Sequence, residues 1–458
     1  MLKMHTKEAT NNMADKWYNP IPILKNHGFG LSQPLNPKTR KPYTLEELRR
    51  VIPEELAKIE LLLPPYDKKV LIDIPSEILR IYQAWRPTPV RRLYALEKLL
   101  GTPAQIWAKD ESVSETGSHK PNTSFMQVHV AKREGATEVV TDTGAGQWGA
   151  SLALAAKTFG LKCTIFMTGK SYDEKPDRVA LMRKLGATVI RSPSNLTGAG
   201  KKAGKVKSQS TGSLGLGISE AFEYVRKTKG AKLCMGCMSN YAVIHQTISG
   251  MECREQFKKL GIKPDIMIGC VGGGSNFGGF ILPFVEDKIE GKIQTKFLAA
   301  EAAAVPVFTK GKYEYDWQDY NKNMPMVRMY SLGYNFFPPG IHAGGLRYHG
   351  KTPILSKLVN EGIVTAKAFG QNEAFRAGLM YFLAEKVIPA PETAHAIRAV
   401  IEEALECKKT GKKTTIVYLH SGNGDADSYA YLTYLLGKLD QETYSHLIPD
   451  IERAKCVE

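Results

Sequence analysis

The sequence predicts an α/β fold built from parallel sheets. Short apolar segments rich in β-branched residues alternate with amphipathic segments of helical length, and glycine-rich or polar loops follow several of the apolar segments. Such alternation is typical of right-handed βαβ units, which place successive parallel strands in one sheet. The chain of 458 residues is long enough for two or three domains and shows no repeat at the periods of solenoid proteins.

The alternation is most regular in the middle of the chain. We expect strands at 106–109, 138–141, 162–168, 187–192, 232–238 and 264–271, and helices at 122–135, 150–159, 174–185, 216–228 and 241–260. Beyond residue 300 the order is looser, with helices at 371–387 and 392–409, a strand at 414–420 and a final helix from near Ala426. The Gly-, Pro- and aromatic-rich segment 330–350 is expected to be a long functional or packing loop.

Residues 1–80 are expected to form an N-terminal extension that wraps the body. They are rich in proline and contain one helical segment, 44–63, which Pro53 interrupts. We also interpret segment 196–213 as a solvated flexible loop, because it is rich in glycine and serine and carries four lysines without interleaved aromatic residues, namely Lys201, Lys202, Lys205 and Lys207.

Composition restricts the class of protein. Hydrophobic residues make up 43% and charged residues 24%, as in ordinary globular proteins, and we find neither a signal peptide nor a transmembrane stretch. Seven cysteines suit a reducing cytoplasm, and Cys234 and Cys237 are expected to be buried thiols in a strand rather than a zinc or redox pair. The net charge of +16 favours anionic small molecules; the basic residues are mostly scattered, so no nucleic-acid partner is expected.

Lys120 is the first candidate for chemistry. It lies in the segment 117–122, directly before a run with apolar residues at helical spacing. A lysine amine at a helix start can form a Schiff base with a carbonyl compound; the alternative is an exposed lysine that precedes a helix.

A glycine run follows the expected strand at 264–271 and opens a helix. Gly272, Gly273 and Gly274 let backbone N–H groups converge on an anion, and Ser275 and Asn276 add donors. The run is neither a Walker loop nor a dinucleotide fingerprint, and the alternative is a tight turn that needs glycine. A cradle for one phosphate together with a reactive amine suggests pyridoxal phosphate.

Two further loops fit an amino-acid substrate. Residues 143–147 expose backbone N–H groups before a helix, which suits a carboxylate. Ser421 follows a late strand and can offer a hydroxyl to the pyridine nitrogen. A neutral hydroxyl does not hold that nitrogen protonated, which favours β-elimination and replacement over transamination.

Five ordered motifs, GSHKPN, TDTGAGQWG, GCVGGGSN, PETAHA and HSGNGD, resemble those of the tryptophan synthase β chain over roughly residues 80–435. The N-terminal extension and FFPPGIHAGGLRYHG are similar to the second, archaeal-type class of these chains. The resemblance implies fold type II of the pyridoxal-phosphate enzymes, with two three-layer α/β domains and the cofactor between them. We expect an N-terminal domain at 115–250, which carries the cofactor lysine and a mobile subdomain with the carboxylate loop, and a C-terminal domain formed by 81–114 and 251–445, which carries the phosphate loop.

The resemblance also implies roles for single residues. Lys120 becomes the Schiff-base lysine and later the base for the substrate α-proton. Cofactor contacts fall on His119, Asn122, Gly272, Gly273, Gly274, Ser275, Asn276, Glu392 and Ser421, and contacts with the substrate carboxylate fall on Thr143, Gly144, Ala145, Gly146 and Gln147. A monovalent cation is a family expectation for which the sequence shows no ligands.

Two positions depart from the family pattern. Asp142 replaces a glutamate that assists loss of the leaving group and engages the indole nitrogen, and Asn335 replaces an aspartate that commonly contacts the substrate hydroxyl. Loss of a negative charge at Asn335 would suit a phosphorylated donor, and Arg347 could bind its phosphate, although packing between domains is an equal alternative for that loop. We therefore expect L-tryptophan formation from indole with O-phospho-L-serine preferred over L-serine as donor. His342 and His349 are too few and too far apart for a metal site.

Other interpretations of the sequence remain open. A serine or threonine dehydratase, or another fold type II β-eliminating or β-replacing enzyme, would share the fold and the lysine, and a non-catalytic relative that binds the cofactor or nucleic acid would show decay at Asp142 and Asn335. The family implies a homodimer. Whether an α subunit binds is left open, because the extension could cover its docking face and leave the protein to use free indole.

Overall fold

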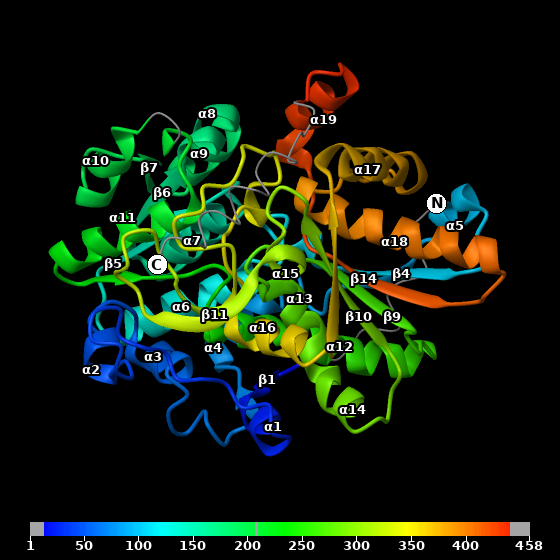
Figure 1. The fold of residues 1–458 in the computed structure, drawn as a ribbon, viewed down its shortest axis with the longest axis horizontal. Coiled ribbons are helices and arrows are strands. Elements are labelled where there is room, and N and C mark those ends of the chain that lie inside the picture. Colours follow the sequence, from blue (N-terminus) through cyan, green and yellow to red (C-terminus); the bar gives the residue numbers. More distant parts are fainter. Residues whose placement is uncertain (1–12, 207–208, 440–458) are drawn as a thin grey trace.

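The computed structural model describes residues 13–206 and 209–439 and has two parallel sheets at its centre (Figure 1). The six-stranded sheet has the order β13-β10-β9-β14-β4-β3, with β13 at Val364–Phe369, β10 at Lys296–Ala302, β9 at Ile266–Cys270, β14 at Thr415–His420, β4 at Gln105–Asp110 and β3 at Val90–Arg92. Only β3 is antiparallel to its neighbour. The predicted α/β fold with parallel sheets is confirmed.

Two hydrophobic cores enclose the six-stranded sheet. Alternate residues of one strand enter different cores, since Ile416 and Tyr418 pack in one and Val417 and Leu419 in the other. The first core includes residues of α5 (Tyr94–Leu100), α17 (Gln371–Glu385) and α18 (Pro391–Thr410), and the second includes residues of α12 (Asn240–Leu260), α13 (Ser275–Ile281) and α16 (Pro353–Asn360). Strands buried on both faces explain the nearly continuous apolar segments in the sequence.

The four-stranded sheet is entirely parallel and has the order β7-β6-β5-β8, with β7 at Thr188–Ser192, β6 at Lys162–Thr168, β5 at Glu138–Thr143 and β8 at Ala231–Leu233. Helices pack around it: α6 (Pro121–Arg133), α7 (Gln147–Phe159), α8 (Gly169–Glu174), α9 (Pro176–Lys184), α10 (Gly198–Gly204) and α11 (Leu214–Lys227). Both α7 and α11 contact β5, and all six residues of β5 are buried.

The described part of the N-terminal extension packs along one side of the molecule. It contains β1 (Lys16–Tyr18), α1 (Ile21–Asn26), α2 (Leu45–Leu48), α3 (Glu54–Glu60), β2 (Leu71–Asp73) and α4 (Ser76–Tyr82). Helix α3 contacts both α6 and α12, and the Leu233 backbone N–H donates to Val51 O at 2.8 Å, which ties the extension to the end of β8. As expected, Pro53 separates α2 from α3.

The remaining elements connect these layers. They are the short helices α14 (Val285–Ile289), α15 (Val307–Lys310) and α19 (Ser428–Leu435), the hairpin of β11 (Lys312–Trp317) with β12 (Met326–Ser331), and the 3-10 turns η1 (Glu111–Val113), η3 (Leu282–Phe284), η4 (Gly344–Leu346) and η5 (Asp425–Asp427). No helix in residues 13–206 and 209–439 combines the length and apolar character needed to cross a membrane.

Two local predictions were wrong. Segment 196–213 is not simply a loop, because it contains α10: Thr197 caps this helix, and Ala199 and Ala203, one turn apart, pack against Leu216. Lys207 lies outside the described residues. The strand expected at 232–238 ends at Leu233, so Cys234 and Cys237 lie beyond it, both as free thiols. The helix expected at 174–185 is confirmed as α9, which begins at Pro176, and the separate short helix α8 precedes it.

Candidate active site

A cavity of about 50 Å³ lies beside the start of α6, at the carboxyl ends of β5 and β8. Six residues singled out from the sequence line it, namely Lys120, Asp142, Thr143, Gly144, Ala145 and Gln147. The rest of the lining comes from Trp148, Leu214, Ile218, Met235, Gly236, Cys237, Met238, Gly345 and Tyr348. The cavity therefore combines one amine, one carboxyl group and backbone donors with a largely apolar wall.

Lys120 lies at the start of α6, as the sequence predicts. It is the N-cap residue, and Pro121 occupies the first helical position, where its missing N–H costs no hydrogen bond. The Lys120 amine donates to Gly236 O at 2.9 Å. Burial lowers the pKa of Lys120, and the nearby Cys237, Glu392 and Asp142 oppose that shift. A lowered pKa increases the fraction of neutral, nucleophilic amine.

The residues before Lys120 are held against the loop after β14. The His119 backbone N–H and its Nδ1 both lie 3.0 Å from Ser421 O, and a carbonyl can only accept, so Nδ1 carries the proton. Burial lowers the pKa of His119 to about 3, which keeps the imidazole neutral. Ser118 also bridges to Gly422. Ser421 is thus held against His119, the residue before Lys120 in the chain; its place beside the cofactor ring stays a prediction.

Asn122 is buried next to Lys120 in the chain but is not part of the cavity wall. Its amide nitrogen donates to Glu111 Oε2 at 2.8 Å and to Gln246 Oε1 at 2.9 Å, and its Oδ1 accepts from Arg86 Nε at 3.2 Å. Glu111 and Arg86 are themselves an ion pair of buried groups. Because both amide protons have acceptors in the protein, Asn122 orients the start of α6 and offers no spare donor to a ligand.

The predicted carboxylate loop follows β5. Gly146 has a φ of 92°, a left-handed conformation that favours glycine, and helix α7 begins at the next residue, Gln147. The Gln147 side-chain Nε2 is buried and donates no hydrogen bond within the described residues. A buried donor without an acceptor is costly unless a ligand supplies one, so Gln147 fits a carboxylate-binding role.

Asp142 is the last residue but one of β5 and lies in the cavity wall with 7% of its surface exposed. Burial raises the pKa of Asp142 to about 7, while its own backbone N–H and the charge of Lys120 act in the opposite direction. A carboxyl group with this pKa can both give and take a proton near neutral pH.

The glycine run forms a sharp connection between β9 and α13 and adjoins the cavity. Gly274 has a φ of 113°, and a β-carbon at Gly272 would overlap Gly345 O, so both positions require glycine. The Ser275 hydroxyl donates to Gly236 O at 3.4 Å, which joins the run to the wall beside Lys120. Within residues 13–206 and 209–439, the backbone N–H groups of Gly272, Gly274 and Ser275 have no protein acceptor. Unused converging donors fit a phosphate group.

Glu392 and Ser421 complete the surroundings. Glu392 is the second residue of α18. It accepts a hydrogen bond from the Gly345 backbone at 2.8 Å and keeps its second oxygen buried without a donor in the described structure. Burial raises the pKa of Glu392, and Lys175 opposes that effect. The Ser421 hydroxyl lies 2.8 Å from the Thr393 hydroxyl and 3.4 Å from Cys270 Sγ.

The two residues proposed from the long loop are not in the cavity wall. Asn335 is exposed. Arg347 is 3% exposed, lies between Leu346 and the cavity-lining Tyr348, and donates to Pro338 O at 3.2 Å. Arg347 is thus a chain neighbour of a wall residue without lining the cavity, and Asn335 lies outside the wall.

Sequence reasoning missed most of the apolar wall. Trp148, Tyr348 and residues 235–238 line the cavity, and the Trp148 indole N–H donates to Thr141 Oγ1 at 2.6 Å. Their place in the chain could have indicated them. Residues 235–238 follow β8 at the same carboxyl edge of the sheet at which Asp142 and Thr143 end β5.

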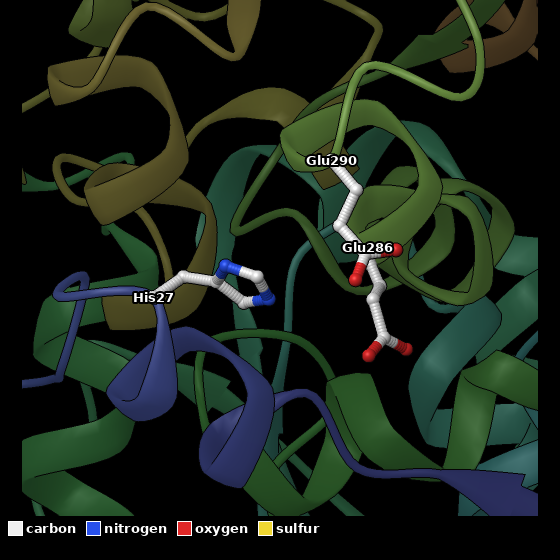
Figure 2. Close-up of side chains that lie close together, drawn as sticks. All are labelled: His27, Glu286 and Glu290. Atoms are coloured by element: carbon white, nitrogen blue, oxygen red, sulfur yellow. The ribbon is translucent and has the colours of Figure 1, made fainter.

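A further group with metal-ligating side chains lies far from this cavity. His27, Glu286 and Glu290 place their ligand atoms within 4.8 Å of one another (Figure 2). Glu290 is ion-paired with Lys292 at 2.5 Å, and Glu286 accepts a hydrogen bond from the Tyr18 hydroxyl at 3.4 Å. Both carboxylates already have partners, so we assign no ion to this group.

Comparison with known proteins agrees with this geometry. Residues 81–422 match the family described as pyridoxal-phosphate dependent enzyme, and the chain belongs to it. Among solved structures, a threonine deaminase from T.th. superimposes with a TM-score of 0.54 at 19% identity, covering 76% of this chain and 97% of that one. Maize serine racemase gives 0.55 at 20% identity, with 79% and 98% covered. These two likenesses confirm the expected fold type II architecture.

Within that class the chain is a member of the tryptophan synthase beta chains. It is 46% identical over 426 residues to tryptophan synthase beta chain 2 of Pyrococcus abyssi, with 93% of this chain and 95% of that protein covered. It is 44% identical over 430 residues to the beta chain 2 of Methanosarcina mazei, with 94% and 96% covered. The predicted family and the prediction of a pyridoxal-phosphate-dependent lyase are confirmed.

Proposed function

We propose that this protein makes L-tryptophan by a β-replacement reaction between indole and a serine-type donor. The observation that carries the proposal is the convergence of the Lys120 amine, the Asp142 carboxyl group and the loop 143–147 on one cavity with an apolar wall. The Lys120 amine and the hydrogen-bond donors of loop 143–147 suit the reaction and the carboxylate of an amino acid. The apolar wall suits a flat apolar molecule such as indole. The names of the related beta chains support the same reaction.

The cofactor fits the residues around Lys120. Pyridoxal phosphate supplies, when bound, an aldehyde for covalent attachment to an amine and a ring that accepts electrons from the substrate. We propose that Lys120 holds the aldehyde, residues 272–276 hold the phosphate, and Ser421 faces the ring nitrogen. His119 and Glu392 border the ring, whereas Asn122 positions Lys120 from below. A monovalent cation remains a family expectation.

Each reacting atom then has a partner in the chain. Loop 143–147 orients the substrate through its carboxylate, and the Lys120 amine removes the proton from the substrate α-carbon and later returns it. Asp142, with its pKa raised to about 7, gives a proton to the departing oxygen, accepts a hydrogen bond from the indole N–H during the attack, and regains a proton when indole C3 loses its hydrogen. Trp148 and Tyr348 keep water from the apolar part of the cavity.

We propose O-phospho-L-serine as the preferred donor, with L-serine as the alternative. Arg347 supports this choice, since it is a buried guanidinium next to the cavity-lining Tyr348 and guanidinium pairs well with phosphate. The departure at Asn335 gives no support, because that side chain is exposed.

A comparison of donors tests the proposal. The ratio of kcat/KM for O-phospho-L-serine to that for L-serine, each with indole, is expected to exceed one in the wild type and to fall about tenfold or more in Arg347→Met. The exposed Arg376→Met is the matched control and should leave the ratio unchanged. A wild-type ratio at or below one contradicts the donor assignment, and pyruvate from serine without tryptophan would indicate a dehydratase instead.

We further infer a homodimer in the cytoplasm. Large apolar side chains are exposed on α17 and on its two neighbours, α5 and α19. Tyr94, Leu383, Tyr429 and Leu435 are each at least 63% exposed. Such a patch is typical of an interface.

The six free cysteines of the described residues suit a reducing compartment. Free indole is proposed as the acceptor, and an α subunit is not required for the chemistry.

A further inference from the structure

Lys351 is a fully buried lysine beside the glycine run. It lies just before α16, with 0% of its surface exposed, and its ammonium donates to Val271 O at 3.0 Å. Val271 is the residue directly before Gly272. The nearest carboxylate oxygen is Glu301 Oε2 at 3.7 Å, which is longer than a hydrogen bond.

The carboxylate of Glu301 accepts hydrogen bonds from other groups. Its Oε2 accepts from the Phe308 backbone at 3.0 Å, and its Oε1 accepts from the Thr309 backbone at 2.9 Å and hydroxyl at 2.7 Å. Burial lowers the pKa of Lys351, and the negative charge of Glu301 opposes this effect. The one close hydrogen bond of the Lys351 ammonium within the described residues is therefore the one to the carbonyl that precedes the glycine run.

Residues 351–352 fix the orientation of two peptide planes in that run. Lys351 holds the Val271 carbonyl, and the Thr352 backbone N–H donates to Gly273 O at 2.8 Å. In a trans peptide the N–H of the next residue points away from the carbonyl. The N–H groups of Gly272 and Gly274 consequently point away from residues 351–352, and neither has an acceptor in the described part of the protein.

We propose that Lys351 is a positioning residue for the cofactor phosphate, which aligns the donors of Gly272 and Gly274 and places a buried positive charge behind them. This inference rests on the proposed function in one respect, the assignment of residues 272–276 to the phosphate. Buried charge interacts over longer distances than exposed charge because water screens it less. The lysine should therefore hold the bound phosphate as a dianion.

The test uses Lys351→Met and two measurements that do not depend on turnover. The dissociation constant of pyridoxal phosphate, from titration of the apoprotein, should rise about tenfold or more. The 31P chemical shift of the wild-type holoenzyme should stay constant between about pH 6 and 8, whereas in Lys351→Met it should change with pH, because a free phosphate ester has a second pKa of about 6.

Two further variants separate this role from general damage. Lys109→Met removes another fully buried lysine, which pairs with Glu252, and should leave the 31P shift constant with pH. The double variant Lys351→Met/Glu301→Gln also removes the carboxylate left alone in the single variant. If it restores wild-type affinity and a constant 31P shift, the single-variant effect came from Glu301 and the proposal is wrong.

Gly274→Ala distinguishes this inference from the assignment on which it rests. Alanine at a φ of 113° is strained, and its β-carbon would lie 2.6 Å from Leu355 Cδ1. If Gly274→Ala leaves cofactor affinity unchanged, the phosphate is not held by residues 272–276. If Gly274→Ala weakens binding but Lys351→Met alters neither the dissociation constant nor the 31P titration, the loop assignment stands and the role of Lys351 is refuted.

Discussion

Replacing Asp142 by asparagine is expected to remove activity and, at the same time, to change how the stability of the apoprotein depends on pH. Asp142 is 7% exposed, and burial raises the pKa of its carboxyl group from the usual 3.8 to about 7. An acid with a raised pKa binds its proton more tightly in the folded than in the unfolded chain.

The size of the effect follows from these two values. The stabilisation by the bound proton is complete below pH 3.8 and is lost as the pH rises through 7. The total loss is about 4 kcal/mol, of which about 2.5 kcal/mol falls between pH 5 and pH 8. Because asparagine does not titrate, the stability of the Asp142→Asn variant does not decrease in this way as the pH rises.

Urea denaturation of the two apoproteins at several pH values between 5 and 8 measures the difference. The free energy of unfolding of Asp142→Asn minus that of the wild type should increase by about 2.5 kcal/mol across this range. A difference that stays constant within about 0.5 kcal/mol would refute the reasoning, because it would mean that Asp142 has an ordinary pKa.

Asp319→Asn provides a contrast. Asp319 is also buried, with a pKa raised to about 6, but its oxygens accept hydrogen bonds from Ser219 and from the backbone of Asn323 and Met324. An amide nitrogen cannot accept, so this variant should be less stable than the wild type at every pH.

Three more predictions concern the site and the assembly. Lys120→Ala should lose the visible absorbance of a covalently held cofactor and lower kcat by at least about a thousandfold, and an absorbance spectrum with a tryptophan assay would check both. Gln147→Ala should raise KM for the amino-acid donor about tenfold with a smaller change in the KM for indole, as measured by steady-state kinetics, because it removes one buried donor to the carboxylate. Leu383→Glu should shift the protein toward a monomer in light scattering, whereas Leu196→Glu, which replaces a similarly exposed leucine away from α17, should not.

The sequence was most informative where strands end. Asp142 and Thr143 close a strand whose apolar run was visible, and the glycine run follows β9 in the same way. Asp142 and Thr143 lie in the wall of the cavity, and the glycine run, which belongs to the other sheet, adjoins that wall at Cys237 and Gly345. The roles of the single residues remain predictions.

Other features depend on contacts that no local pattern shows. The segment 235–238 was expected to continue a strand but forms part of the cavity wall. The helix α10 is stabilised because Ala199 and Ala203 pack against Leu216. Asn335 was placed by comparison of a motif, whereas only the path of segment 330–350 shows that its side chain is exposed. No pattern in the sequence distinguishes Lys351 from a surface lysine.

The most direct test of the account is the formation of tryptophan by the purified protein with bound pyridoxal phosphate, from indole and either O-phospho-L-serine or L-serine, alongside Lys120→Ala. We expect tryptophan from the wild type, faster with the phosphorylated donor, and none above background from Lys120→Ala. Tryptophan formation by Lys120→Ala at the wild-type rate, or a wild type that binds the cofactor but forms no tryptophan with either donor, would contradict the proposed reaction.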